Sequence, residues 1–224
     1  MITMTSKQLE KSLWLIQGYY RFLYLWLFLE DIIKKNDLTW FAKDIKISTW
    51  SDTSFKLKKD TIKKLLSDIH QNPDKQNFFW YFTQITMFRW ICATMKELID
   101  SENNFKRFLK KNLKSQFFHF EHTIKFIRNV LSHNIDTNIH IKRQDYESQK
   151  TYLLESGKHI INLNFKYSKY FPKYWTWDKN YWVNVKINFK KIWNNDKFFD
   201  IVDLHQLFLI SELCYNITVV WKNV

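Results

Sequence analysis

The segment FFHFEHTIKFIRNVLSHN, residues 117–134, decides the fold expected of this chain. Its apolar residues recur at three- and four-residue steps, the spacing of one face of an amphipathic helix. Near its end lies Arg128, one of only five arginines, five residues before His133. An arginine keeps its positive charge, whereas a histidine exchanges protons near neutral pH. We therefore take this helix as both the framework of the fold and the candidate site.

The same helical spacing recurs along the rest of the chain. Thr5 or Ser6 can cap the first helix, and Asn72-Pro73-Asp74 reads as a helix break. Further helices are expected over residues 6–35, from Thr53 or Ser54 to that break, over residues 76–100, after Ser101, and over residues 200–221.

The pattern changes from helical to alternating after residue 134. Residues 138–142 and 181–189 alternate apolar and polar side chains, which is typical of half-buried strands. Ser156-Gly157 lies between residues 151–155 and 158–162 like a hairpin turn. These features predict a small antiparallel sheet.

The predicted fold class is therefore mainly α. We expect an up-and-down helical bundle with a small antiparallel β insertion before the C-terminal helix. At 224 residues the chain is expected to form one domain over residues 1–224, with the β-rich insertion over residues 137–192.

The run of residues 13–29 in the first helix is very apolar. It falls short of the roughly 20 residues that a membrane span needs, and it carries Gln17 and Arg21. A helix buried in a bundle or in a subunit interface fits the pattern better, so we expect no membrane partner.

The net charge of +13 comes from 35 lysines and arginines against 22 aspartates and glutamates. The chain is rich in Lys, Asn, Ile and Phe and has only two glycines and two prolines, a bias that an AT-rich coding sequence produces without selection on the protein. Positive charge permits nucleic acid or an acidic membrane as a partner, but here it does not decide between them.

The cysteines and the N-terminal residues bear on location. Cys92 and Cys214 lie inside apolar helical patterns, which favours a reducing compartment over a disulfide framework or a zinc site. The first residues lack the charged segment, the apolar segment and the small-residue cleavage site of a signal peptide. We expect a cytoplasmic location.

Two stretches of sequence near the candidate helix each allow two interpretations. A lysine cluster just before that helix is either a solvated face, which we favour, or a contact for a phosphate backbone. The aromatic stretch of residues 167–182 either packs the insertion, which we favour, or stacks the bases of single-stranded nucleic acid. The cluster consists of Lys106, Lys110, Lys111 and Lys114.

Arg128 and His133 are suited to cleaving a phosphodiester by an internal 2′-hydroxyl. The imidazole moves a proton while the guanidinium holds the phosphate and offsets its developing charge. On a straight helix the two side chains point about 140° apart. They converge on one target only if the helix loosens near Ser132 or if a second copy of the chain faces the first. Without catalysis, both residues simply favour the negative end of the helix dipole.

A metal site is the competing chemistry on the same helix. His119 and His122 lie three residues apart, with Glu97 and Glu102 as the nearest acidic candidates on another helix. No matching second pair is obvious in the sequence, so we predict no metal. The alternative interpretation is that the two histidines line an RNA path beside Arg128. Gly18 and Gly157 stand alone, so no glycine-rich phosphate loop is present and no cofactor is expected.

The stretch from Arg128 to His133 resembles the signature of the HEPN superfamily, which comprises small helical-bundle domains, many of them metal-independent endoribonucleases. That signature is an arginine, often followed by a polar residue, and then a histidine a few positions later. Arg128 matches the arginine, Asn129 the polar neighbour and His133 the histidine. The match covers about a dozen residues and a compatible helical context.

The resemblance implies a homodimer that cleaves RNA to leave a 2′,3′-cyclic phosphate. It implies His133 as general acid or base and Arg128 as the phosphate clamp, with Asn129 and Ser132 orienting the pair. Members often act as the toxin of a toxin–antitoxin or anti-phage system, so the expected partners are RNA, a second copy and an antitoxin protein. The alternatives are a non-catalytic module that binds RNA or protein and, less favoured, a protein of the membrane surface.

Overall fold

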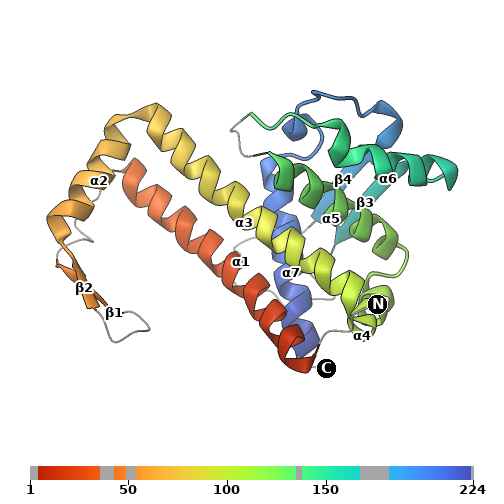
Figure 1. The fold of residues 1–224 in the computed structure, drawn as a ribbon, viewed down its shortest axis with the longest axis horizontal. Helices are drawn as coiled ribbons and strands as arrows, with labels where there is room; N and C mark the ends of the chain where they lie inside the picture. The colour runs from red at the N-terminus through yellow and green to blue at the C-terminus, as the bar shows by residue number, and fades with distance from the viewer. Residues whose placement is uncertain (1–4, 36–42, 49–53, 135–137, 167–181, 223–224) are drawn as a thin grey trace. The chain divides into compact units, whose positions relative to one another are not determined.

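The computed structural model describes residues 5–35, 43–48, 54–134, 138–166 and 182–222. These residues are mainly helical, with an antiparallel strand pair before the C-terminal helix, which confirms the predicted class. The elements are α1 (Ser6–Lys34), β1 (Ile45–Ser48), β2 (Ser54–Leu57), α2 (Lys59–Gln71), α3 (Pro73–Ser101), α4 (Asn103–Leu113), α5 (Gln116–His133), α6 (Arg143–Glu155), β3 (Ile160–Lys166), β4 (Trp182–Asn188) and α7 (Leu204–Lys222) (Figure 1).

The chain divides into two compact units, and the dividing points fall within α1 and α3. One unit contains Met1–Phe22 and Ile85–Val224, and the other contains Leu23–Gln84. The organisation as one domain with an insertion over residues 137–192 stays a prediction. All the candidate site residues belong to the first unit.

The smaller unit contains a hairpin that the sequence reading missed. β1 and β2 pair antiparallel, with Ile47 opposite Phe55, and α2 begins only at Lys59. The prediction of a helix from Thr53 or Ser54 is therefore wrong at its start. Phe55 and Leu57 alternate with lysines, which is a strand period, and the helical spacing begins after them. Trp26 of α1 anchors this unit by packing against Leu29, Leu66 and Ile69.

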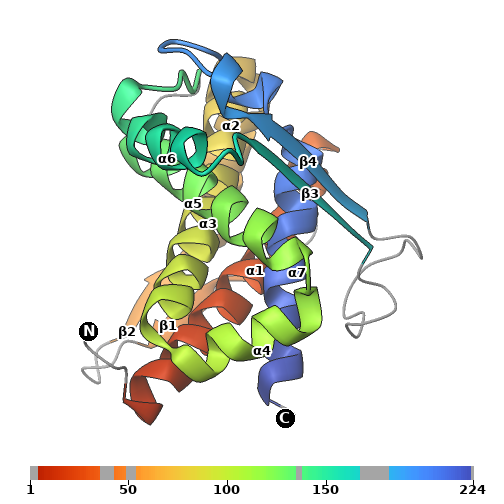
Figure 2. The same ribbon diagram turned by 90° about the vertical axis from the view of Figure 1, so that its right-hand side faces the viewer.

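The core of the larger unit lies between α5, α7 and the β3–β4 pair. β3 packs against α5 and β4 against α7 (Figure 2). Alternate residues of both strands are buried, as in a sheet with one face on a core. Aromatic contacts join the elements, with ring centroids 5.6 Å apart for Phe126 and Phe189 and 4.6 Å apart for Tyr20 and Tyr215. This packing fixes α5, which carries the candidate site.

The segment before β3 is helical where strands were predicted. Residues 143–155 form α6, so the proposed hairpin around Ser156-Gly157 is wrong. Gly157 has φ +69° and ends the helix, a conformation that glycine adopts at low cost. Residues 138–142 form no named strand; His140 makes an isolated bridge to Lys197. The predicted strand at 181–189 corresponds to β4.

The helices around α5 begin and end at residues other than those predicted. Glu102, not Ser101, caps α4, because its side chain accepts a hydrogen bond from the backbone N–H of Asn104. Lys114, at φ 51°, interrupts the chain between α4 and α5. The C-terminal helix α7 begins at Leu204, after a short 3-10 turn over Phe198–Asp200.

Helix α1 is buried on one face only, because Trp14, Phe22 and Leu25 are exposed, whereas both cysteines are buried as their patterns indicate. Ile16 and Tyr20 of α1 are almost fully buried. None of the helices within the described ranges has both the length and the apolar character that crossing a bilayer requires. Cys92 and Cys214 are free and buried, and burial raises the pKa of the Cys92 thiol to about 12.

Candidate functional site

The C-terminal end of α5 carries all four predicted site residues. Arg128 and His133 are exposed, while Asn129 and Ser132 are half-buried. Apolar neighbours such as Ile127 and Val130 are fully buried and fix this face of the helix against the core. The two charged or titratable groups therefore reach solvent from a rigid support.

A carboxylate from another helix holds His133. Asp145, in the first turn of α6, is fully buried, and its Oδ1 lies 2.6 Å from Nδ1 of His133, whose side chain is 39% exposed. A carboxylate accepts hydrogen bonds only, so the contact places the imidazole proton on Nδ1. Nε2 is then left as the nitrogen that can exchange a proton with a substrate.

Two further groups satisfy the buried carboxylate. Oδ2 of Asp145 accepts hydrogen bonds from the backbone N–H of Lys142 at 2.8 Å and from Nδ2 of Asn134 at 3.3 Å. Asn134 also donates through Nδ2 to the carbonyl oxygen of Val130 at 2.7 Å. A buried charge is tolerated where its lone pairs are occupied in this way. Asp145 thus joins the start of α6 to the end of α5.

A chain of hydrogen bonds links the arginine of the motif to the same aspartate. Nη1 of Arg128 donates to Oδ1 of Asn129 at 3.1 Å, and Nδ2 of Asn129 donates to the backbone oxygen of Asp145 at 3.2 Å. Asn129 therefore bridges Arg128 and the backbone of Asp145. No hydrogen bond joins the Ser132 hydroxyl to any residue that the structure describes, so Ser132 takes no part in this network.

Helix α5 does not loosen near Ser132. It stays α-helical through His133 and ends at Asn134, which has extended backbone angles. Asn134 was the predicted stop, but the loosening that would bring Arg128 and His133 together within one chain does not occur. The two side chains remain on faces about 140° apart.

Three residues outside the motif contribute to this helix end. Asp145 holds the imidazole, Nζ of Lys142 donates to the carbonyl oxygen of His133 at 3.0 Å, and Nη2 of Arg89 donates to that of Asn134 at 2.8 Å. Partial burial lowers the pKa of Arg89. Asp145 was not predicted from the sequence, because strands and not α6 were expected after residue 137. An acidic residue three positions after Lys142, where a helix could start, was the available signal.

The other two histidines of α5 have separate partners. Nδ1 of His119 accepts from the backbone N–H of Asn162 at 3.2 Å, and Nδ1 of His122 lies 3.2 Å from the amide nitrogen of Gln149. Burial lowers the pKa of both imidazoles, to about 4 for His122. Within the described ranges no group of three or more histidines, cysteines and acidic residues is placed to hold a metal ion.

The lysine cluster lies against the opposite half of α5 from the motif. Lys106 pairs with Glu121 at 3.0 Å, and the ammonium groups of Lys106 and Lys110 lie over the ring of Phe117. Of the aromatic stretch at 167–182, all but Trp182 falls outside the described residues. Trp182 is exposed and donates through Nε1 to Oδ1 of Asn164 at 2.6 Å.

Comparison of the chain with protein families, with curated proteins and with solved structures finds no match.

Proposed function

We propose that this protein is a homodimeric, metal-independent endoribonuclease of the HEPN type that acts in the cytoplasm. The observation that supports it best is an exposed imidazole, His133, held through Nδ1 by the fully buried carboxylate of Asp145. An imidazole fixed in one tautomer by a buried carboxylate is a recurring device for general acid–base catalysis. Arg128, exposed on the same helix end, supplies the positive charge for the phosphate.

The proposed reaction moves two protons. The 2′-oxygen of the RNA forms a bond to phosphorus as the bond to the 5′-oxygen breaks, which leaves a 2′,3′-cyclic phosphate and a 5′-hydroxyl. Nε2 of His133 removes the proton of the 2′-hydroxyl, and the His133 of the second protomer, which enters the reaction as an imidazolium, delivers its Nε2 proton to the 5′-oxygen. Arg128 offsets the negative charge that builds on the non-bridging oxygens. Asp145 and Asn129 act as positioning residues.

The dimer is part of the proposal for a geometric reason. On a regular helix Arg128 and His133 point about 140° apart, so one copy of α5 does not aim both at one phosphate. A two-fold axis beside the end of α5 would place the Arg128 of one protomer near the His133 of its partner. In this proposal the enzyme is the toxin of a toxin–antitoxin or anti-phage system, and an antitoxin protein restrains it.

Cleavage of single-stranded RNA in excess chelator tests the proposal. The wild-type protein should cut under these conditions, and Arg128→Ala and His133→Ala should each reduce the rate by about 10²-fold or more. His205→Ala, which alters an exposed histidine on α7, is the matched control and should cut normally. Circular dichroism and the mass in solution should show that every variant stays a folded dimer. Cutting that stops with chelator would refute the mechanism.

A non-catalytic binding module is the second candidate, favoured by a different observation. Trp193 is 64% exposed, and Nζ of Lys150 lies 4.6 Å from its ring centroid, an arrangement suited to stacking a nucleobase. This function would be identified if the protein binds RNA in chelator without cleaving it. Trp193→Ala should then weaken RNA binding, whereas His133→Ala should not.

A further inference from the structure

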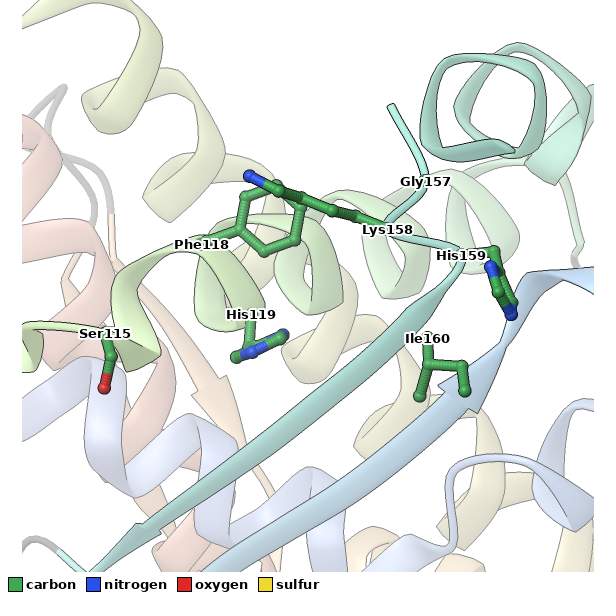
Figure 3. A pocket seen from close by; sticks show the side chains of 7 residues that line it. All are labelled: Ser115, Phe118, His119, Gly157, Lys158, His159 and Ile160. Atoms are coloured by element: carbon green, nitrogen blue, oxygen red, sulfur yellow. The ribbon is translucent and has the colours of Figure 1, made fainter. Parts of the chain in front are cut away.

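A pocket lies at the opposite end of α5 from His133. It has a volume of about 400 Å³ and lies between the start of α5 and the loop that leads from α6 into β3 (Figure 3). His119, in this pocket, precedes His133 by fourteen residues, which corresponds to about 21 Å along the helix axis. The lining residues are Ser115, Phe118, His119, Gly157, Lys158, His159 and Ile160.

The polar side chains of this pocket include cationic and donor groups but no carboxylate. The backbone N–H of Asn162 donates to Nδ1 of His119, so the ring proton resides on Nε2 and is available to a ligand. Burial, and then the charge of Lys158, lowers the pKa of His119, which keeps this imidazole neutral and a donor at pH 7. The side chains of Ser115 and His159 bond to none of the described residues.

The remaining lining is apolar and includes an aromatic ring. Phe118 and Ile160 form opposite sides of the pocket, and Nζ of Lys158 lies over the Phe118 ring, 5.0 Å from its centroid (Figure 3). A volume of this size suits a small ligand rather than a single ion. The combination of donors, one fixed cation and apolar walls matches a compound with an anionic group and an apolar or aromatic body.

We propose that this pocket binds a nucleotide unit through its phosphate, with Lys158 and His119 as the donors. The phosphate belongs either to an RNA strand that extends along α5 or to a free nucleotide. In the first case the inference rests on the proposed ribonuclease function, because the pocket then holds substrate several nucleotides from the scissile bond. In the second case the pocket is an independent ligand site.

Calorimetric titration of the full chain tests this site with two probes, AMP and a 2′-O-methyl oligonucleotide that lacks the attacking hydroxyl. Lys158→Gln should weaken binding of at least one probe about tenfold, because it removes a charged hydrogen-bond donor. Lys186→Gln, which removes an exposed lysine from β4, is the control of equal charge and should bind as the wild type does. Circular dichroism should show both variants folded.

The two probes separate the sources of the phosphate. Weaker binding of AMP to Lys158→Gln identifies a free-nucleotide site. Weaker binding of the oligonucleotide alone identifies an RNA contact. Equal losses in Lys158→Gln and Lys186→Gln, or no loss in Lys158→Gln, would overturn the proposal. His205→Ala, which alters an exposed histidine on α7 outside both sites, should keep the binding of whichever probe Lys158→Gln weakens. Neither probe can be cleaved, so binding is measured independently of cleavage. The site can therefore stand if cleavage is never found, and cleavage can stand if the site fails.

Discussion

The two halves of α5 carry histidines in opposite surroundings. His133, at the C-terminal end, keeps 39% of its side chain exposed and lies 2.6 Å from the carboxylate of Asp145. His122, in the N-terminal half, is buried and lies 3.2 Å from the amide nitrogen of Gln149. Both partners come from α6 and are four residues apart, so they share one face of that helix.

This contrast shows that the partner, not the residue type, sets what each imidazole can do. Burial lowers the pKa of His122 to about 4, which leaves it a neutral packing group at pH 7. A buried carboxylate behind an exposed ring instead fixes the tautomer of His133 and can offset a positive charge that develops on it in a reaction. The α6 partners of the structural His122 and of the candidate catalytic His133 therefore lie only one helical turn apart.

Removing the charge of Asp145 should give the largest effect. In Asp145→Asn the amide can donate to Nδ1 of His133, which would favour the other tautomer and block Nε2 as a base. RNA cleavage, measured as kcat/KM across pH, should fall by about 10³-fold or more. Gln149→Met, the matched change at the other α6 partner, should cleave normally. If Asp145→Asn cuts at the wild-type rate, the difference between the two histidines has no catalytic meaning.

Acid should destabilise the protein through His122. The unfolded chain takes up this proton near pH 6.5, whereas the folded state resists it down to about pH 4. The free energy of unfolding should therefore fall as pH drops through this window, by no more than about 3 kcal/mol from this group.

Urea unfolding at several pH values measures this contribution. His122→Gln should flatten the pH dependence between pH 6.5 and 4, because it removes the titrating group. His205→Gln, an exposed histidine on α7, should keep the wild-type dependence. Identical curves for wild type and His122→Gln would show that burial does not govern this imidazole.

The smallest effect is expected from Lys142, an exposed residue whose side chain contacts the C-terminal end of α5. Its Nζ donates to the carbonyl oxygen of His133 at 3.0 Å, where a positive charge favours the end of a helix. Lys142→Met should lower the free energy of unfolding by about 0.5 kcal/mol, measured by urea titration. Lys190→Met is the exposed control. A loss several times larger would place the Lys142 side chain, and not only its backbone N–H, among the groups that support the buried Asp145.

The local sequence pattern was sufficient to predict α5, the helix that carries the candidate site. The apolar spacing of residues 117–134 predicted α5, and Asn134 was identified as its stop. These features depend on residues within one or two turns of each other, so the sequence by itself determined them.

The sequence pattern predicted the wrong kind of element between residues 138 and 162, because two local signals both favoured strands. Alternation at 138–142 and the Ser156-Gly157 pair suggested hairpins, yet residues 143–155 form α6. Gly157 serves a helix end as readily as a hairpin, because both use a positive φ. Packing against α5 decided between them.

Only the tertiary structure decided which histidine has a carboxylate partner. Twelve residues and a change of direction separate Asp145 from His133, and residues 135–137 between the two helices lie outside the described ranges. Nothing in the spacing distinguishes His133 from His122, which lie on one helix. The packing of α6 on α5 places a buried charge beside one and a neutral amide beside the other. Burial and partner charge are long-range properties, so they arise only when the helices meet.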